Sequence, residues 1–202
     1  MLIGLTGGIC SGKTTIARAF GEMGASIIDL DSLGHQVLKY DSLVKERLIY
    51  SFGAGILNKR GEIDRGKLGR LVFVNPDYLI KLNSIVHPPL IHLADEKIKF
   101  ELSQHETVVL DAALLIECNM TDITDFVVLV YTDEATQVKR LMKRGLSEED
   151  AWARVRSQMT FQEKKIYADY IIDNRASISD AVKRAKEIWE QLQSLLKSHI
   201  SS

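Results

Sequence analysis

The segment Gly7-Gly8-Ile9-Cys10-Ser11-Gly12-Lys13-Thr14 fits the pattern G-x-x-x-x-G-K-[ST], which is typical of a phosphate-binding loop. It directly follows a short apolar run, residues 2–6, that predicts a strand, and residues 13–23 have the apolar spacing of a helix. Glycines in such a loop let successive N–H groups point into one concavity, and the helix N-terminus adds partial positive charge. Because the strand, loop and helix signals agree, we expect a nucleoside triphosphate site rather than a chance glycine-rich turn.

Composition and charge bound the class of protein. The chain has 202 residues, 46% of them hydrophobic, and a net charge of −1. Such a chain can bury a sizeable core, and its charge argues against broad nucleic-acid binding. Cys10 and Cys118 are the only cysteines, which excludes a disulfide framework and favours a reducing compartment. No apolar run suits a membrane span and no segment resembles a signal peptide, so we expect a cytoplasmic protein without nucleic-acid, membrane or obligate protein partners.

The order of the remaining elements predicts an α/β fold with a parallel central sheet. A second strand at residues 25–31 would complete a βαβ unit, which requires parallel strands and a right-handed crossover. Apolar runs that fit strands buried on both faces occur at residues 107–111, 125–131 and 170–173. Residues 178–196 have the pattern of a long amphipathic helix. We therefore predict a three-layer α/β/α nucleotide-binding core formed by residues 1–31 and 105–202.

Two helical regions are predicted to interrupt this core. Residues 32–104 lack a convincing buried strand and are interpreted as a helical insertion that binds an acceptor substrate. Residues 134–168 are highly charged and helical in pattern, with a turn at Gly145 and a helix start at Ser147. We expect this second region to form a helical lid over the nucleotide.

Three aspartates at predicted strand ends are candidates for chemistry. Asp31 would stand where the second strand meets the insertion, which makes it the candidate general base, although it could instead cap the following helix. Asp29 would point to the other face of the strand and could order the loop or a metal-bound water. Asp111 ends a Val-Val-Leu run, the pattern of a Walker B carboxylate near Mg²⁺, although strands also end in aspartate for turn reasons.

Taken together, these motifs resemble the dephospho-coenzyme A kinase family of P-loop kinases. The resemblance covers nearly the whole chain, and the stretches that carry it are Leu5–Thr15, Asp29–Asp31, Ile63–Arg65, Ile85–Pro88, Leu114–Glu117, Arg140–Arg144 and Tyr170–Asn174. A T-G-G-I-x-S-G-K loop, a D-x-D pair and a V-H-P triplet in this order discriminate better than any one motif. The resemblance implies a P-loop kinase fold and transfer of phosphate from ATP to the ribose 3′-hydroxyl of dephospho-CoA, which gives CoA and ADP in the final step of coenzyme A biosynthesis.

The resemblance also implies roles for the matching residues. It places Lys13 on the β- and γ-phosphates and makes Asp31 the base. Arg140 would stabilise the charge that develops on the transferred phosphoryl group. Arg65 and His87 would lie near the acceptor. The implied nucleotide-binding set is Gly8, Ile9, Cys10, Ser11, Gly12, Lys13, Thr14, Thr15, Arg144 and Asn174, with Asn174 at the adenine. The implied Mg²⁺ ligands are Thr14 and, through water, Asp111.

Structural alternatives stay open for several of these residues. His87 precedes Pro88 and could simply shape a turn, and Arg140 with Arg144 could form an exposed basic helix face. The chain also differs from the family pattern, which has glycine in place of Cys10, serine in place of Thr14 and proline in place of Ala113. Thr14 keeps the metal-binding hydroxyl, whereas Cys10 must adopt a backbone conformation that a side chain tolerates.

Two other functions compete with this interpretation. Another small-molecule or nucleoside monophosphate kinase would share the same core, because a phosphate loop does not specify the acceptor. A nucleotide-dependent switch is suggested by residues 31–34, which match D-x-x-G, and by residues 58–61, which begin like N-K-x-D. The second element lacks its aspartate, and the first follows the loop too closely for a switch segment.

Overall fold

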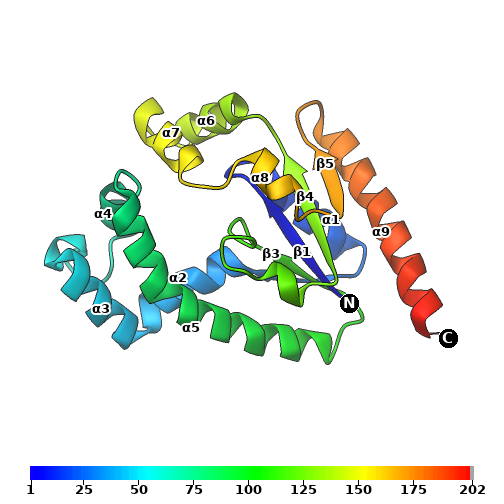
Figure 1. The fold of residues 1–202 in the computed structure, drawn as a ribbon, viewed down its shortest axis with the longest axis horizontal. Helices are drawn as coiled ribbons and strands as arrows, with labels where there is room; N and C mark the ends of the chain where they lie inside the picture. Colours follow the sequence, from blue (N-terminus) through cyan, green and yellow to red (C-terminus); the bar gives the residue numbers. More distant parts are fainter. Residues whose placement is uncertain (201–202) are drawn as a thin grey trace.

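The computed structural model describes residues 1–200 and has a five-stranded parallel sheet at its centre (Figure 1). The strands are β1 (Leu2–Gly7), β2 (Ser26–Asp29), β3 (Val108–Asp111), β4 (Phe126–Tyr131) and β5 (Tyr170–Asp173). Their order is β2-β3-β1-β4-β5, and every neighbouring pair is parallel. All carboxyl ends therefore lie along one edge of the sheet, which confirms the predicted α/β class and the P-loop kinase arrangement.

Helices cover both faces of the sheet and its carboxyl edge. They are α1 (Lys13–Glu22), α2 (Leu30–Tyr40), α3 (Ser42–Phe52), η1 (Ala54–Ile56), α4 (Arg65–Val72), α5 (Pro76–Leu102), η2 (Thr121–Ile123), α6 (Glu134–Lys143), α7 (Glu148–Arg156), α8 (Phe161–Lys165) and α9 (Ile178–Ile200). Figure 1 shows α9 on one side of the sheet, α2 to α5 extending away on the other, and α6 with α7 beyond the strand tips.

Alternating side chains of β1 supply two separate cores. Ile3 and Leu5 are fully buried with Phe20 of α1 and with the apolar face of α9. Leu2 points to the opposite face, where it joins the core formed with the insertion helices and Leu115. Because strand side chains alternate between faces, one continuous apolar strand can hold both helical layers in place. The predicted three-layer architecture is confirmed.

The second strand is shorter than the sequence predicted. The expectation of a strand through Asp31 was wrong at its end, because β2 stops at Asp29 and Leu30 already begins α2. Leu30 and Leu33 are both buried, and helical spacing is what brings them to the same face. The helix cap predicted as an alternative role for Asp31 belongs to Asp29, whose carboxylate accepts the N–H of Ser32 at 3.0 Å.

The insertion is helical, as predicted, and the turn at His87 that the sequence left open as an alternative is absent. His87, Pro88 and Pro89 lie inside the continuous helix α5, so the interpretation of His87 as a turn-shaping residue was wrong. Proline disfavours a helix interior by about 3 kcal/mol. Here buried residues on both sides of the prolines, such as Val86 and Leu90, pack into the shared core and hold the helix together.

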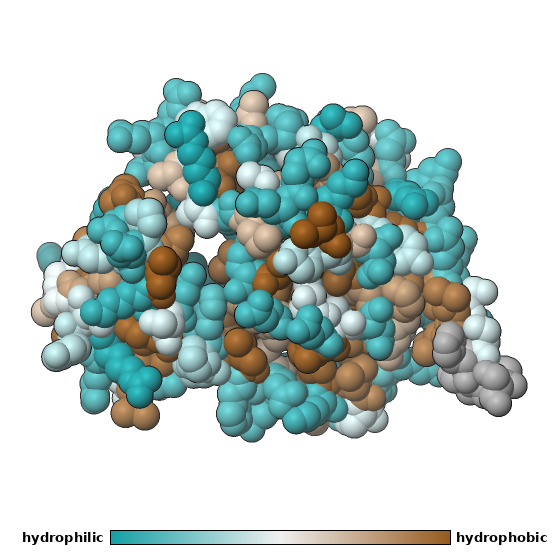
Figure 2. Space-filling view, in the orientation of Figure 1, coloured by the Kyte–Doolittle hydropathy of each residue, from teal (hydrophilic) through white to brown (hydrophobic). Residues whose placement is uncertain are grey.

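The surface is mainly hydrophilic, and Figure 2 shows it hollowed between the insertion and the core beneath the lid. Among residues 1–200, no helix combines the length and apolarity that a membrane span requires.

Helix α1 begins at a glycine that no other residue can replace without cost. Gly12 is the N-cap of α1 with φ 95° and ψ 11°, a left-handed conformation. A β-carbon at this position would overlap the side-chain amide of Asn174, which is buried after β5. Both the backbone conformation and the available space therefore demand glycine.

Replacement of Gly12 by alanine is expected to lower the free energy of unfolding by about 2–4 kcal/mol, because it adds backbone strain to a steric clash. Urea unfolding of the nucleotide-free protein would measure the change. Gly55→Ala is the matched control, since a β-carbon at Gly55 meets nothing within 4 Å. Equal stability of the two variants would contradict this account of Gly12.

Candidate active site

The phosphate-binding loop connects β1 to α1 at the centre of the sheet. Its backbone is closed by two short-range bonds, from Ser11 N–H to the Gly8 carbonyl and from Thr15 N–H to the Gly12 carbonyl, each of 3.0 Å. The Ser11 hydroxyl is buried and has no hydrogen-bond partner among the described residues. A buried hydroxyl without a partner is costly, so it fits a loop built to hold an anion.

Residues distant in the sequence hold the outer side of the loop. Asn174 donates its amide N–H to the Ser11 carbonyl at 2.7 Å, and Arg140 of α6 donates to the Cys10 carbonyl at 2.8 Å. Both carbonyl oxygens are thereby engaged outside the concavity. The structure thus brings these two predicted site residues to the loop, with Asn174 contacting the loop backbone.

Cys10 has φ 58°, a left-handed conformation that is unusual for a residue with a side chain. The sequence led us to expect a backbone conformation that a side chain tolerates, and the conformation found is one that glycine adopts far more readily. With Ile9, it packs against the small apolar core of the lid, formed by Val138, Leu141, Ala151 and Val155. The side chain of Cys10 therefore joins the loop to the lid.

Lys13 forms an ion pair with Asp111 at the end of β3. Asp111 is almost fully buried, and this burial raises the pKa of its carboxyl group, while the neighbouring Lys13 ammonium opposes the rise. Asp29 lies opposite Asp111 in the sheet register, so a second carboxylate is close to the first. Asp111, the acid predicted at the end of this strand, therefore acts directly on the charge of the loop residue Lys13.

Asp31 lies in the first turn of α2 and is exposed, with His35 one helical turn further on. Burial and the charge of Arg65 lower the pKa of His35, whereas the Asp31 carboxylate opposes this shift. The pKa of Arg65 is also lowered by burial and held up by Asp31. The Asp31 carboxylate is therefore near enough to Arg65 to act on its charge.

His87 lies deeper, at the contact between α5 and the loop after β3. Its ring nitrogens are 3.7 and 3.8 Å from the Cys118 sulfur, and burial lowers the pKa of the imidazole. The pKa of the Cys118 thiol is raised to about 11 by burial and by the carboxylates of Glu117 and Asp31. Asp31 is therefore near enough to act on the thiol that His87 contacts.

The two arginines predicted on one helix face have different environments. Arg140 is half-buried against the loop, whereas Arg144 is the C-cap residue of α6 and is exposed. Thr14 is exposed in the first turn of α1. The resemblance implied that Arg140 acts on the transferred group and that Arg144 binds the nucleotide; in the structure Arg140 contacts the loop backbone and Arg144 is exposed.

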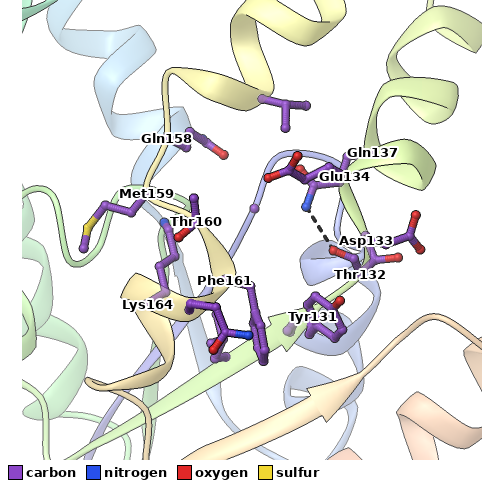
Figure 3. Close-up of a pocket in the computed structure, with 15 residues that line it drawn as sticks. Tyr131, Thr132, Asp133, Glu134, Gln137, Gln158, Met159, Thr160, Phe161 and Lys164 are labelled. Atoms are coloured by element: carbon purple, nitrogen blue, oxygen red, sulfur yellow. Dashed lines mark hydrogen bonds between the residues drawn. The ribbon is translucent and has the colours of Figure 1, made fainter.

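A cavity of about 360 Å³ adjoins the loop at Gly8 (Figure 3). Figure 3 shows Thr132 and Gln137 on one side of this cavity and Phe161 with Lys164 on the other. The Thr132 hydroxyl is buried without a partner among the described residues. The cavity is thus a mixed polar and apolar space beside the phosphate loop, and it contains none of the acceptor residues predicted from sequence.

Two further contacts were missed from the sequence. Lys164 is almost fully buried and pairs with Glu117 at 2.9 Å, while also donating to the Ala113 carbonyl at 2.7 Å. Gln158, just after α7, accepts the N–H of Ile9 at 2.8 Å. These contacts fix α8 and the lid to the core. A lysine or a glutamine in a charged arm gives no sequence signal that distinguishes it from its solvated neighbours.

Comparison with known proteins agrees with this geometry. Residues 1–180 match the family model described as CoaE, dephospho-CoA kinase. The dephospho-CoA kinase of Carboxydothermus hydrogenoformans is 45% identical over 193 residues, covering 94% of this chain and 93% of that protein. The crystal structure of TT1252 from Thermus thermophilus has a TM-score of 0.77 at 32% identity, with 95% and 97% of the chains covered. The dephospho-CoA kinase of Campylobacter jejuni has a TM-score of 0.69 at 27% identity and covers 98% of both chains.

Replacement of Lys13 by methionine is expected to lower the free energy of unfolding by about 2–4 kcal/mol at pH 7, because a buried carboxylate loses its cation. Burial raises the pKa of Asp111 above its unfolded value, so the ionised carboxylate opposes folding as the pH rises through that pKa. The loss should therefore be smaller at pH 4, where Asp111 takes up a proton. Urea unfolding without nucleotide at the two pH values measures it.

Two controls test the cause of this loss. Lys139→Met removes an exposed lysine of α6 and should change stability little. The double variant K13M/D111N should recover most of the stability lost in K13M. A loss in K13M that is independent of pH and is not relieved by D111N would show that the ion pair is not the cause.

Proposed function

The chain belongs to the dephospho-CoA kinase family, and from this premise we propose that it transfers the γ-phosphoryl group of ATP to the ribose 3′-hydroxyl of dephospho-CoA, giving CoA and ADP. The single observation that carries this assignment is the position of Asp31. Its carboxylate stands between the phosphate loop and the insertion, beside Arg65, in the cleft where a donor and an acceptor nucleotide would meet.

The donor phosphates would lie in the concavity of the loop, where amide groups, the Ser11 hydroxyl and the N-terminus of α1 converge. Lys13 exchanges its ion pair with Asp111 for the β- and γ-phosphate oxygens. Arg140 already lies against the loop and is positioned to approach the charge that develops on the transferred group. These three groups bind and orient the donor.

The residues at the loop also fit a Mg²⁺ ion. Thr14 offers a hydroxyl oxygen and Asp111 a carboxylate, the hard ligands that Mg²⁺ prefers, and Asp29 lies beside Asp111 in the sheet. No cluster of three or more acidic, histidine or cysteine side chains within the described part of the chain could hold a metal by itself. This suits a cation held mainly by water and nucleotide oxygens; when bound, it would neutralise phosphate charge.

The acceptor step depends on Asp31. Its carboxylate takes the proton of the 3′-hydroxyl as that oxygen attacks the γ-phosphorus in line, while the bond from phosphorus to the β–γ bridging oxygen breaks and ADP leaves. Arg65 and His87, whose pKa values are both lowered by burial, would lie on the acceptor side. Contact between α6, α7 and the loop would exclude water from the reacting phosphorus. A small-molecule acceptor agrees with the near-neutral charge of the chain.

An acceptor panel tests the assignment directly. ADP release should be fastest with dephospho-CoA and much slower with AMP, UMP or shikimate at equal concentrations, because the cleft is proposed to recognise the whole acceptor nucleotide. A coupled ADP-release assay with each acceptor and no acceptor as the blank makes this comparison. Preference for any other member of the panel would reject dephospho-CoA as the substrate.

Replacement of Asp31 by asparagine should lower kcat about 100- to 10,000-fold, because asparagine cannot accept the proton of the attacking 3′-hydroxyl. The KM for ATP should change by less than about threefold, since Asp31 acts on the acceptor. Asp77→Asn is a matched control, because Asp77 is an exposed acid in the first turn of another insertion helix. Near-normal turnover by the Asp31 variant would refute its role as base.

A further inference from the structure

Arg154 of the lid contacts the insertion across the cleft. Its guanidinium carbon lies 5.4 Å from the ring centroid of Phe73, just after α4, in a cation–π contact. A β-carbon placed at Gly69 would be 3.9 Å from the Arg154 Nη2 atom. Figure 1 shows α7 and α4 close together at this point. The long cationic side chain of Arg154 therefore forms a contact between the lid and the insertion.

The surface of α4 that receives Arg154 also carries Arg65. Residues 65, 69 and 73 are spaced by four along the chain, so they follow one face of the helix. The charge of Arg154 contributes to lowering the pKa of Arg65, after the larger effect of burial. Two guanidinium groups from separate parts of the protein thus approach one another over the same helix face.

Neither guanidinium group is neutralised by an ion pair. Within the described part of the chain, no carboxylate lies within 4 Å of Arg65 or Arg154. Asp31 is near enough to raise the pKa of Arg65, which opposes the lowering caused by burial. It nevertheless supplies one negative charge against two positive charges. Arg154 is half-buried, whereas Arg65 is exposed at the start of α4, so the screening of their mutual repulsion is reduced mainly on the Arg154 side. This arrangement is stabilised when an anion with several oxygens lies between them.

We propose that Arg65 and Arg154 together bind the diphosphate of the acceptor nucleotide, and that Arg154 is a specificity-determining residue of the lid. This inference rests on the proposed function, because dephospho-CoA carries a diphosphate between its ribose 5′-oxygen and its pantetheine arm. The planar fork of arginine suits bidentate binding of phosphate oxygens. Asp31 lies beside this pair, so the 3′-hydroxyl of the same nucleotide is directed to the base.

The lid segment that carries Arg154 also connects the proposed acceptor site with the phosphate loop. Gln158, two residues after the end of α7, accepts the Ile9 N–H, so this part of the lid contacts the loop while Arg154 reaches the insertion. A diphosphate between Arg65 and Arg154 removes the repulsion between lid and insertion. Acceptor binding therefore favours the arrangement in which the lid lies over both substrates.

The test compares three variants of α7. Arg154→Ala removes the charge, Arg154→Lys keeps it without the planar fork, and Arg156→Ala is the matched control. Arg156 lies on the same helix, is exposed, and rests over the ring of Trp152 at 5.0 Å, away from α4. For each variant, kcat and KM are measured for dephospho-CoA and for ATP. The inhibition constant of adenosine against dephospho-CoA is also measured, since adenosine shares the nucleoside but has no phosphate.

Arg154→Ala is expected to raise the KM for dephospho-CoA about 10- to 100-fold, the loss typical of a hydrogen bond between charged groups. The KM for ATP and the inhibition constant of adenosine should stay within about twofold of the unmodified protein. Arg154→Lys should recover part of the loss, and Arg156→Ala should behave like the unmodified protein. This pattern separates diphosphate binding from general damage to the lid, which would weaken adenosine equally.

Three results would overturn the proposal: an unchanged KM for dephospho-CoA, an equal loss for adenosine, or a main effect on the KM for ATP, which would assign Arg154 to the donor phosphates.

Calorimetric titration of dephospho-CoA into the protein with a non-hydrolysable ATP analogue separates this proposal from the proposed function. Binding weakened by Arg154→Ala supports the diphosphate site even without turnover. Turnover of dephospho-CoA combined with binding that does not depend on Arg154 would reject the diphosphate site alone.

Discussion

The left-handed turn at Gly12, closed from behind by Asn174, is the constraint on which the site depends. The turn starts α1 and sets the direction of the phosphate loop, and the Asn174 amide fills the space that a β-carbon would need while bonding the Ser11 carbonyl. Asn174 follows β5, at the far side of the sheet order from β2 and β3. The loop can therefore take its shape only when the parallel sheet is complete, since strand ends that are distant in sequence meet at one edge.

The charges around the loop favour ligand binding over stability of the free protein. Lys13 and Asp111 form a largely buried ion pair, whose desolvation offsets most of its attraction. Arg154 lies near enough to Arg65 to lower its pKa, and neither arginine forms an ion pair in the described part of the chain. Each arrangement improves when phosphate groups arrive. The lid is instead attached to the loop by uncharged contacts, through Gln158 and the apolar packing of Cys10. These contacts can keep the lid in place without substrate.

Much of the fold followed from the sequence, and the errors have physical causes. Strong apolar runs marked β1 and β4, whose two-sided burial leaves no ambiguity. The end of β2 was misplaced because residues 28–33 satisfy both strand and helix patterns locally, and only the burial of Leu30 and Leu33 against the insertion decides for the helix. The prolines of α5 were misinterpreted for the same reason: packing on both sides of them outweighs a local preference that is real but small.

By itself, the sequence determined the phosphate loop, the parallel α/β class, the helical insertion and the family resemblance, because each depends on residue types at fixed spacing along the chain. It also led to the prediction that Asp31, Arg65, Arg140 and Asn174 are site residues. Only the tertiary structure decided that Asp29 caps a helix, that Arg140 contacts the loop backbone while Arg144 is exposed, and that Arg154 rests over Phe73 of the insertion. These outcomes depend on how separate elements pack, and residue spacing within one element carries no information about which of its faces meets another element.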